Sequence, residues 1–158
     1  MEQISKVITV EEHFMSEKVN GEYQKLLEKK NLTLAQKAKA SFIQQFVAKG
    51  EITEVGEKRL EFMETHGIDC QILSYGNNSP SYLDPKQAVV LCQMANEELA
   101  EYCKQYPGKF YGFAVLPVGD TDAALTELKR AVKTLGLRGI VFNGAYQGSY
   151  FDEDRFFP

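Results

Sequence analysis

The residues with the clearest potential for chemistry are Glu11 and His13, in the segment Val7-Ile-Thr-Val-Glu-Glu-His-Phe14. A short apolar run precedes them, which predicts that they lie at the carboxyl end of a strand. Because side chains alternate between the two faces of a strand, Glu11 and His13 should share one face and Glu12 the other. A carboxylate and an imidazole on one face suit a divalent metal ion such as Zn²⁺ or Mn²⁺. An exposed polar corner leading into a loop is the alternative interpretation.

Polar residues also follow two other predicted strands. Ser74 and Asn77 come at the end of the strand predicted over 70–74, and Asn143 follows the strand predicted over 138–142. Their hydroxyl and amide groups could line a substrate pocket and bind carboxylate or hydroxyl groups. Serine and asparagine are also common turn formers, which would explain the same residues without a function.

Four apolar segments predict the strands that would position these residues, and a helical pattern precedes each of the last three. The predicted strands cover 6–10, 70–74, 111–116 and 138–142. The predicted helices begin near Glu57, at Pro85 after an Asp84 cap, and after Asp120 or Thr121. Alternation of strands and helices at this rhythm predicts right-handed βαβ units and a parallel sheet.

The last of these helices has a predicted buried face and a predicted end. Gly136 should end it, since glycine is favoured just beyond the last helical turn. Its apolar face comprises Ala124, Leu125, Leu128, Ala131, Val132 and Leu135.

A helical insertion of about 16–50 is expected after the first strand. It contains two helix candidates, 16–30 and 33–49, and the second opens with a capping box of Thr33 and Gln36 and ends at Gly50. Such an insertion could serve as a lid or as a subunit contact.

The 158 residues predict one domain, 1–158. The sequence ends on two aromatic residues and a proline soon after the fourth strand, and the outer edge of that strand would have no partner. Both observations favour the front part of a longer α/β fold; a complete four-stranded doubly wound domain is the alternative.

Composition narrows the class of protein. A formal net charge of −4 without a basic stripe argues against a nucleic-acid or anionic-membrane partner. No apolar run approaches the roughly 20 residues of a membrane helix, and the amino terminus lacks the features of a signal peptide. The three cysteines, Cys70, Cys92 and Cys103, are unclustered, which favours buried thiols in a reducing, cytoplasmic setting.

Several ordered segments together resemble one family, the amidohydrolase-related metal-dependent decarboxylases, which include aminocarboxymuconate-semialdehyde and γ-resorcylate decarboxylases. The segments are Val10-Glu-Glu-His-Phe14 and residues 59–74, 109–117, 137–144, 147–148 and 150–158. The resemblance implies the N-terminal half of a (β/α)₈ TIM barrel with one divalent metal ion, Zn²⁺ or Mn²⁺, at its mouth. By position, Glu11 and His13 would be the first two ligands. In the family the remaining ligands, a His and an Asp, come from the second half of the barrel, so the resemblance implies that they lie beyond this chain. The other histidine, His66, precedes Gly67 at a helix end, where contact with the last carbonyls is favoured over a metal site.

The implied reaction is non-oxidative decarboxylation of a hydroxylated aromatic acid in the complete polypeptide, because Glu in the first ligand position is similar to the branch acting on hydroxybenzoic acids. The same scaffold could instead hydrolyse an amide, ester or lactone. A third hypothesis is a non-catalytic half-barrel that associates through its unfinished edge. The resemblance further implies a homo-oligomer that takes a small aromatic acid.

Overall fold

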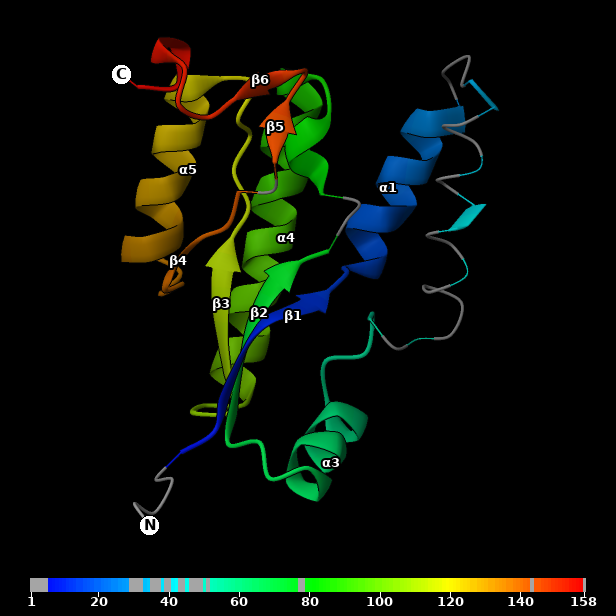
Figure 1. The fold of residues 1–158 in the computed structure, drawn as a ribbon, viewed down its shortest axis with the longest axis vertical. Coiled ribbons are helices and arrows are strands. Elements are labelled where there is room, and N and C mark those ends of the chain that lie inside the picture. Colours follow the sequence, from blue (N-terminus) through cyan, green and yellow to red (C-terminus); the bar gives the residue numbers. More distant parts are fainter. Residues whose placement is uncertain are drawn as a thin grey trace.

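A four-stranded parallel sheet forms the frame of the molecule (Figure 1). The computed structural model describes residues 6–28, 52–76, 79–142 and 144–157, together with 33, 34, 38, 41, 42, 45 and 50. The strands follow one another in the sheet in chain order and are β1 (Ile8–Phe14), β2 (Cys70–Tyr75), β3 (Phe110–Ala114) and β4 (Gly139–Ile140). All three pairings are parallel, as successive units of a (β/α)₈ barrel require. The expected α/β half-barrel architecture is therefore confirmed.

Helices connect the strands, and a small hairpin follows the last one. The helices are α1 (Glu17–Glu28), α3 (Glu57–Thr65), α4 (Pro85–Gln105) and α5 (Thr121–Lys133), with 3₁₀ turns η1 (Pro80–Tyr82) and η2 (Asp154–Phe156). The hairpin pairs β5 (Ala145–Tyr146) with β6 (Ser149–Tyr150). Most of the predicted helix over 33–49, including Gln36 of its capping box, lies outside the described residues. No helix within the described ranges has both the length and the apolar character needed to cross a membrane.

The predicted helix signals are confirmed by their contacts. Asp84 accepts a hydrogen bond from the backbone N–H of Lys86 at 3.3 Å, and Asp120 accepts one from Ala123 at 3.0 Å. Both carboxylates satisfy donors that the first turn of a helix leaves unpaired. Gly136, with φ of +78°, follows α5 in the left-handed conformation that glycine adopts without strain.

The hydrophobic core lies between the sheet and the helices that cover it. Phe14, Leu73 and Tyr75 are buried on the strands, and α4 lies behind the sheet in Figure 1. The buried residues of α4 that join this cluster are Ala88, Leu91, Cys92, Ala95, Leu99 and Ala100. Gly112 on β3 allows α4 to approach closely, because a Cβ atom there would lie 2.6 Å from Leu99.

Two sequence predictions differ from the structure, one on α5 and one on β1. Val132, predicted to be buried, is 43% exposed, whereas Glu127 on α5 is only 2% exposed. The helix turns its charged residue inward because Arg130 and Asn96 bind the Glu127 carboxylate. The first strand also lies later than predicted, at 8–14 and not 6–10, so the polar residues at its end are part of the strand.

Candidate functional site

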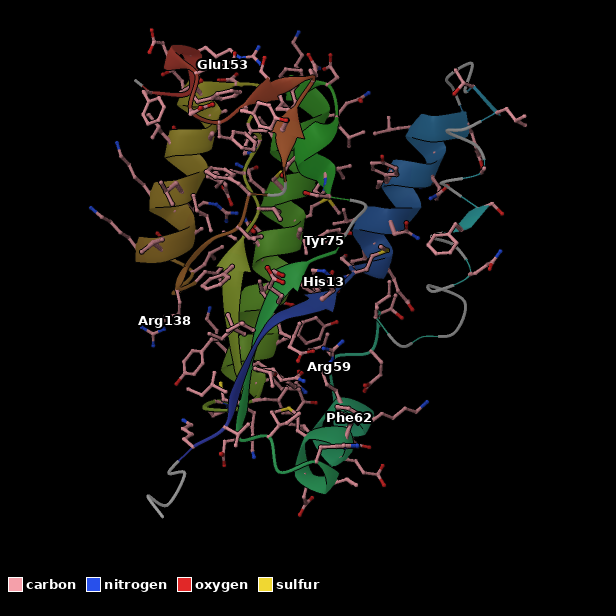
Figure 2. All side chains as sticks on the ribbon, in the orientation of Figure 1. His13, Arg59, Phe62, Tyr75, Arg138 and Glu153 are labelled. Atoms are coloured by element: carbon pink, nitrogen blue, oxygen red, sulfur yellow. The ribbon has the colours of Figure 1, made fainter. Side chains whose placement is uncertain are left out.

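Glu11 and His13 lie on β1 near its carboxyl end, as predicted, and both are exposed. In the sheet register His13 pairs with Ser74 of β2, and its Nδ1 lies 3.3 Å from Ser74 Oγ. Figure 2 shows His13 beside the end of β2, where Tyr75 is labelled. A partner at Nδ1 fixes the orientation of an imidazole ring and leaves Nε2 for a metal ion, the usual arrangement of a metal-binding histidine.

The strand that carries these residues is irregular. β1 advances three residues, from Thr9 to Glu12, while β2 advances two, from Gln71 to Leu73. An extra residue of this kind forms a bulge. Within it, Glu11 has φ of +58°, a left-handed conformation that costs a non-glycine residue roughly 1–2 kcal/mol. Such strain persists only where surrounding contacts enforce it, and it is common at functional sites.

The bulge determines which face of the sheet His13 occupies. Residues paired in register share a face, and side chains alternate along each strand. Thr9 pairs with Gln71 and His13 pairs with Ser74, so Thr9 and His13 lie on opposite faces. In a regular strand, residues four apart would share a face. Glu12 pairs with Leu73 and His13 with Ser74, so these two side chains lie on opposite faces, as predicted. The prediction also assumed that side chains alternate regularly along the whole strand, and the bulge between Thr9 and Glu12 shows that this assumption is wrong.

A third residue, Arg59 of α3, binds this region from the opposite side of the sheet. Its Nη2 donates to the His13 carbonyl at 3.0 Å, its Nη1 donates to Gln71 Oε1 at 3.3 Å, and its Nε donates to the Glu54 carbonyl at 3.2 Å. Burial lowers the pKa of the guanidinium, while the carboxylates of Glu12 and Glu54 counter that effect. Sequence reasoning assigned Arg59 no role, although an arginine beside apolar residues of an amphipathic helix is a usable signal.

A cavity of about 1170 Å³ borders Arg59. Its lining includes Glu12 of β1, Gln71 of β2 and Tyr102 of α4. Glu12 and Gln71 occupy the face of the sheet opposite Ser74. Together with Arg59 and Tyr102, these residues place the cavity on the helix side of the sheet.

The other residues singled out from the sequence have different outcomes. Ser74 is buried against His13, and its role in substrate binding stays a prediction. Asn77 and Asn143 lie outside the described residues. His66 Nδ1 lies 2.8 Å from the Phe62 carbonyl at the end of α3, the helix-end contact that the sequence favoured over a metal site.

The donors for a metal ion within the described ranges are few. No group of three or more His, Cys, Asp or Glu side chains there could hold a metal ion. Cys70, Cys92 and Cys103 are free thiols. Burial raises the pKa of Cys92 to about 12 and that of Cys103 to about 11, so neither thiol is a ready ligand or nucleophile near neutral pH. A carboxylate and an imidazole suit a divalent metal ion by their chemistry, and the role of Glu11 and His13 as ligands stays a prediction.

The chain is similar in sequence to proteins of known function. A family model described as amidohydrolase matches residues 43–158. The γ-resorcylate decarboxylase of Rhizobium radiobacter is 40% identical over 99 residues, which make up 61% of this chain and 30% of that protein. The chain thus spans about a third of the length of this curated relative.

Two solved structures have the same fold. A 5-carboxyvanillate decarboxylase from Novosphingobium aromaticivorans, with bound manganese and 3-methoxy-4-hydroxy-5-nitrobenzoic acid, gives a TM-score of 0.86 at 28% identity, over 98% of this chain and 47% of that one. A dihydroxybenzoic acid decarboxylase from a Polaromonas species, with bound manganese and 2-nitroresorcinol, gives a TM-score of 0.72 at 28% identity. That match covers 96% of this chain and 44% of the decarboxylase.

Proposed function

The chain belongs to the amidohydrolase family, and from this premise we propose that Glu11 and His13 bind a divalent metal ion in a site that decarboxylates hydroxylated aromatic acids. The observation that carries the proposal is the bulged end of β1. There His13 has Nδ1 against Ser74 and Nε2 available, and residues 10 and 11 together stand opposite Ile72, which shares a face of β2 with Ser74. The bulge thus supports a common face for Glu11 and His13.

Manganese is the metal ion bound in the solved structures that support the proposal. Both decarboxylase structures compared above hold manganese beside an aromatic ligand. One carboxylate and one imidazole suit Mn²⁺ or Zn²⁺, and zinc is the alternative outcome of a metal titration. A bound ion would neutralise the negative charge of a substrate carboxylate and a neighbouring phenolic oxygen.

The reaction defines what the polypeptide must provide. An aromatic acid loses CO₂ from one ring carbon and gains a proton at the same carbon, so the site needs a cation near the carboxylate and an acid near the ring. Glu11 and His13 hold the cation in this proposal, and Ser74 orients His13. Asn77 and Asn143 are proposed to bind the substrate's oxygen atoms with their amide groups.

The proposal is tested by titrating Mn²⁺ into the purified chain by calorimetry. Glu11→Gln and His13→Ala should each weaken binding by about tenfold or more, because the first removes the negative charge of a ligand and the second removes the imidazole donor. Glu22→Gln is the matched control, since Glu22 is an exposed carboxylate on α1 that pairs with Lys25, and it should leave the affinity unchanged. Equal binding by all four proteins, or equal loss in the control, would exclude the proposed ligands.

The reaction is tested by following CO₂ release from 2,6-dihydroxybenzoate with the manganese-loaded protein. Metal-dependent release that is lost in Glu11→Gln supports the decarboxylase. Hydrolysis of an ester or lactone without CO₂ release would instead support a hydrolase on this scaffold.

A further inference from the structure

We propose that Arg59 is a positioning residue of this site: from the helix side of the sheet it holds the bulge in β1 that turns His13 to the face of Ser74. The role in metal binding rests on the proposed function above. The role in holding the strand rests on the contacts of Arg59 alone. Figure 2 shows Arg59 between α3 and the end of β1.

The guanidinium group spans the irregular part of the strand. Gln71, which accepts from Nη1 at 3.3 Å, is paired with Thr9 before the bulge. The carbonyl of His13, which accepts from Nη2 at 3.0 Å, comes after the bulge. One rigid planar group therefore links β1 after the bulge to the β2 residue that pairs with β1 before the bulge, and so favours the shifted register.

Arg59 is itself fixed on the α3 side. Its Nε donates to the Glu54 carbonyl at 3.2 Å, and its backbone N–H donates to Glu54 Oε2 at 3.1 Å. The guanidinium plane thus has three anchoring directions, toward Glu54, Gln71 and His13. A lysine ammonium group is a point charge on a flexible stem and cannot reproduce that fork.

Charge favours the same register. Glu12 pairs with Leu73, which places it on the face of Gln71, and its carboxylate attracts the Arg59 guanidinium. If β1 continued from Thr9 without the bulge, Glu12 would pair with Ser74 and leave that face. His13 would then turn toward the helices, away from the predicted metal site. The hydrogen bonds and the ion attraction of Arg59 both oppose that slip.

The strain at Glu11 needs such support. A non-glycine residue at φ of +58° relaxes unless its surroundings hold it. Among the described residues, Arg59 donates a side-chain hydrogen bond to the backbone of β1 from the helix side. Loss of this contact should let the bulge relax or shift along the strand.

The test is nuclear magnetic resonance on Arg59→Lys in the full 158-residue chain. A positive φ brings the amide proton of a residue close to its own Hα, so Glu11 should show a strong intraresidue Overhauser effect in the unaltered protein. We expect that signal to weaken in Arg59→Lys and the amides of residues 12–14 to exchange about tenfold faster or more, because the local opening equilibrium shifts. An unchanged Glu11 signal would overturn the proposal.

Two control variants separate positioning from general stability. Arg138→Lys makes the same exchange next to β4, where Arg138 lies over the Tyr111 ring, and should leave Glu11 unaffected. Met63→Ala removes a fully buried side chain from α3 without touching the hydrogen bond to His13. If Met63→Ala weakens the Glu11 signal as much as Arg59→Lys does, Arg59 acts only by stabilising α3 and the proposal fails.

A second readout links Arg59 to the metal ion. Mn²⁺ affinity should fall about tenfold in Arg59→Lys and stay unchanged in Arg138→Lys, as for other residues that orient a ligand. A weakened Glu11 signal with unchanged Mn²⁺ affinity would overturn the role in metal binding. If the unaltered protein binds no Mn²⁺, the proposed function fails, and the Glu11 signal still decides whether Arg59 holds the bulge.

Discussion

The ends of β1 and β3 lie in the same sheet but are held in opposite ways. After β3, Asn96 of α4 accepts a hydrogen bond from the Val115 N–H and donates to the Val115 carbonyl, both at 2.9 Å. The same amide donates to Glu127 Oε1 at 2.7 Å, and all these groups are buried. At the end of β1, Glu11 is exposed and strained, and its carboxylate has no hydrogen bond among the described residues.

The two regions also differ in how their charges are satisfied. Arg130 binds both oxygens of Glu127, at 2.8 and 2.9 Å, and extends to Glu97 on the surface at 2.8 Å. A buried network with every partner in place rigidifies a fold, but it has no capacity left for a ligand. Glu11 keeps that capacity at the expense of strain. Stability and binding capacity are therefore separated between two strand ends of the same sheet.

The largest expected effect comes from opening the satisfied network. Glu127→Ala should lower the free energy of unfolding by about 3 kcal/mol, because it removes the buried carboxylate that Arg130 binds and one of the two acceptors of the Asn96 amide. Urea denaturation measures this loss. Glu97→Ala removes an exposed partner of the same Arg130 and should cost at most about 1 kcal/mol. Similar losses in the two variants would refute the contrast between buried and exposed carboxylates.

A smaller effect should appear at alkaline pH through Cys92, a thiol near this network. Burial, and to a lesser extent the charge of Glu127, raises the pKa of Cys92 from 9.0 to about 12. Above pH 9 the unfolded chain releases the thiol proton while the folded chain keeps it, so stability is lost as pH rises. This thiol should account for about 1 kcal/mol of lost stability between pH 8 and pH 10.

The measurement is the free energy of unfolding at both pH values in the unaltered protein and in Cys92→Ala. Burial also raises the pKa values of Tyr75 and Cys103, but both groups are present in the two proteins, so the difference between the proteins isolates the thiol of Cys92. The same pH dependence in the two proteins would mean that the Cys92 thiol is accessible to water in the folded state.

The smallest expected effect has the opposite sign and concerns the strained strand. Glu11→Gly should raise the free energy of unfolding by about 0.5 kcal/mol, since glycine adopts a positive φ without strain but loses more entropy on folding. Glu12→Gly should lower the free energy of unfolding, because Glu12 has no positive φ to relieve and glycine loses more entropy on folding. Thermal or urea unfolding of both variants tests the comparison, and a destabilised Glu11→Gly protein would show that the bulge is unstrained.

Much of this molecule follows from local sequence. The helices α4 and α5 begin where Asp84 and Asp120 indicated, and α3 and α5 end shortly before Gly67 and Gly136, because those signals act within one turn. Glu11 and His13 were found for a similar reason, since a short polar motif after an apolar run predicts a strand end.

The features that the sequence did not predict depend on distant partners. The bulge in β1 exists only relative to β2, some 60 residues away. Glu127 is buried because Asn96, 31 residues earlier, binds it. Arg59 contacts a backbone carbonyl 46 residues away, which no periodic pattern can indicate. In each case a polar group is placed by tertiary contacts that override a local preference.

The bulge in β1 makes the candidate site sensitive to the number of residues as well as to their identity. Deletion of Val10, which lies between Thr9 and Glu12, would leave Glu11, Glu12 and His13 all present in the chain. It would nevertheless move His13 to the helix side, because the pairing before the bulge would then continue in step. Variation in this strand should therefore tolerate substitutions better than insertions or deletions. A chain one residue shorter here could keep its fold and its polar motif and still lose the site.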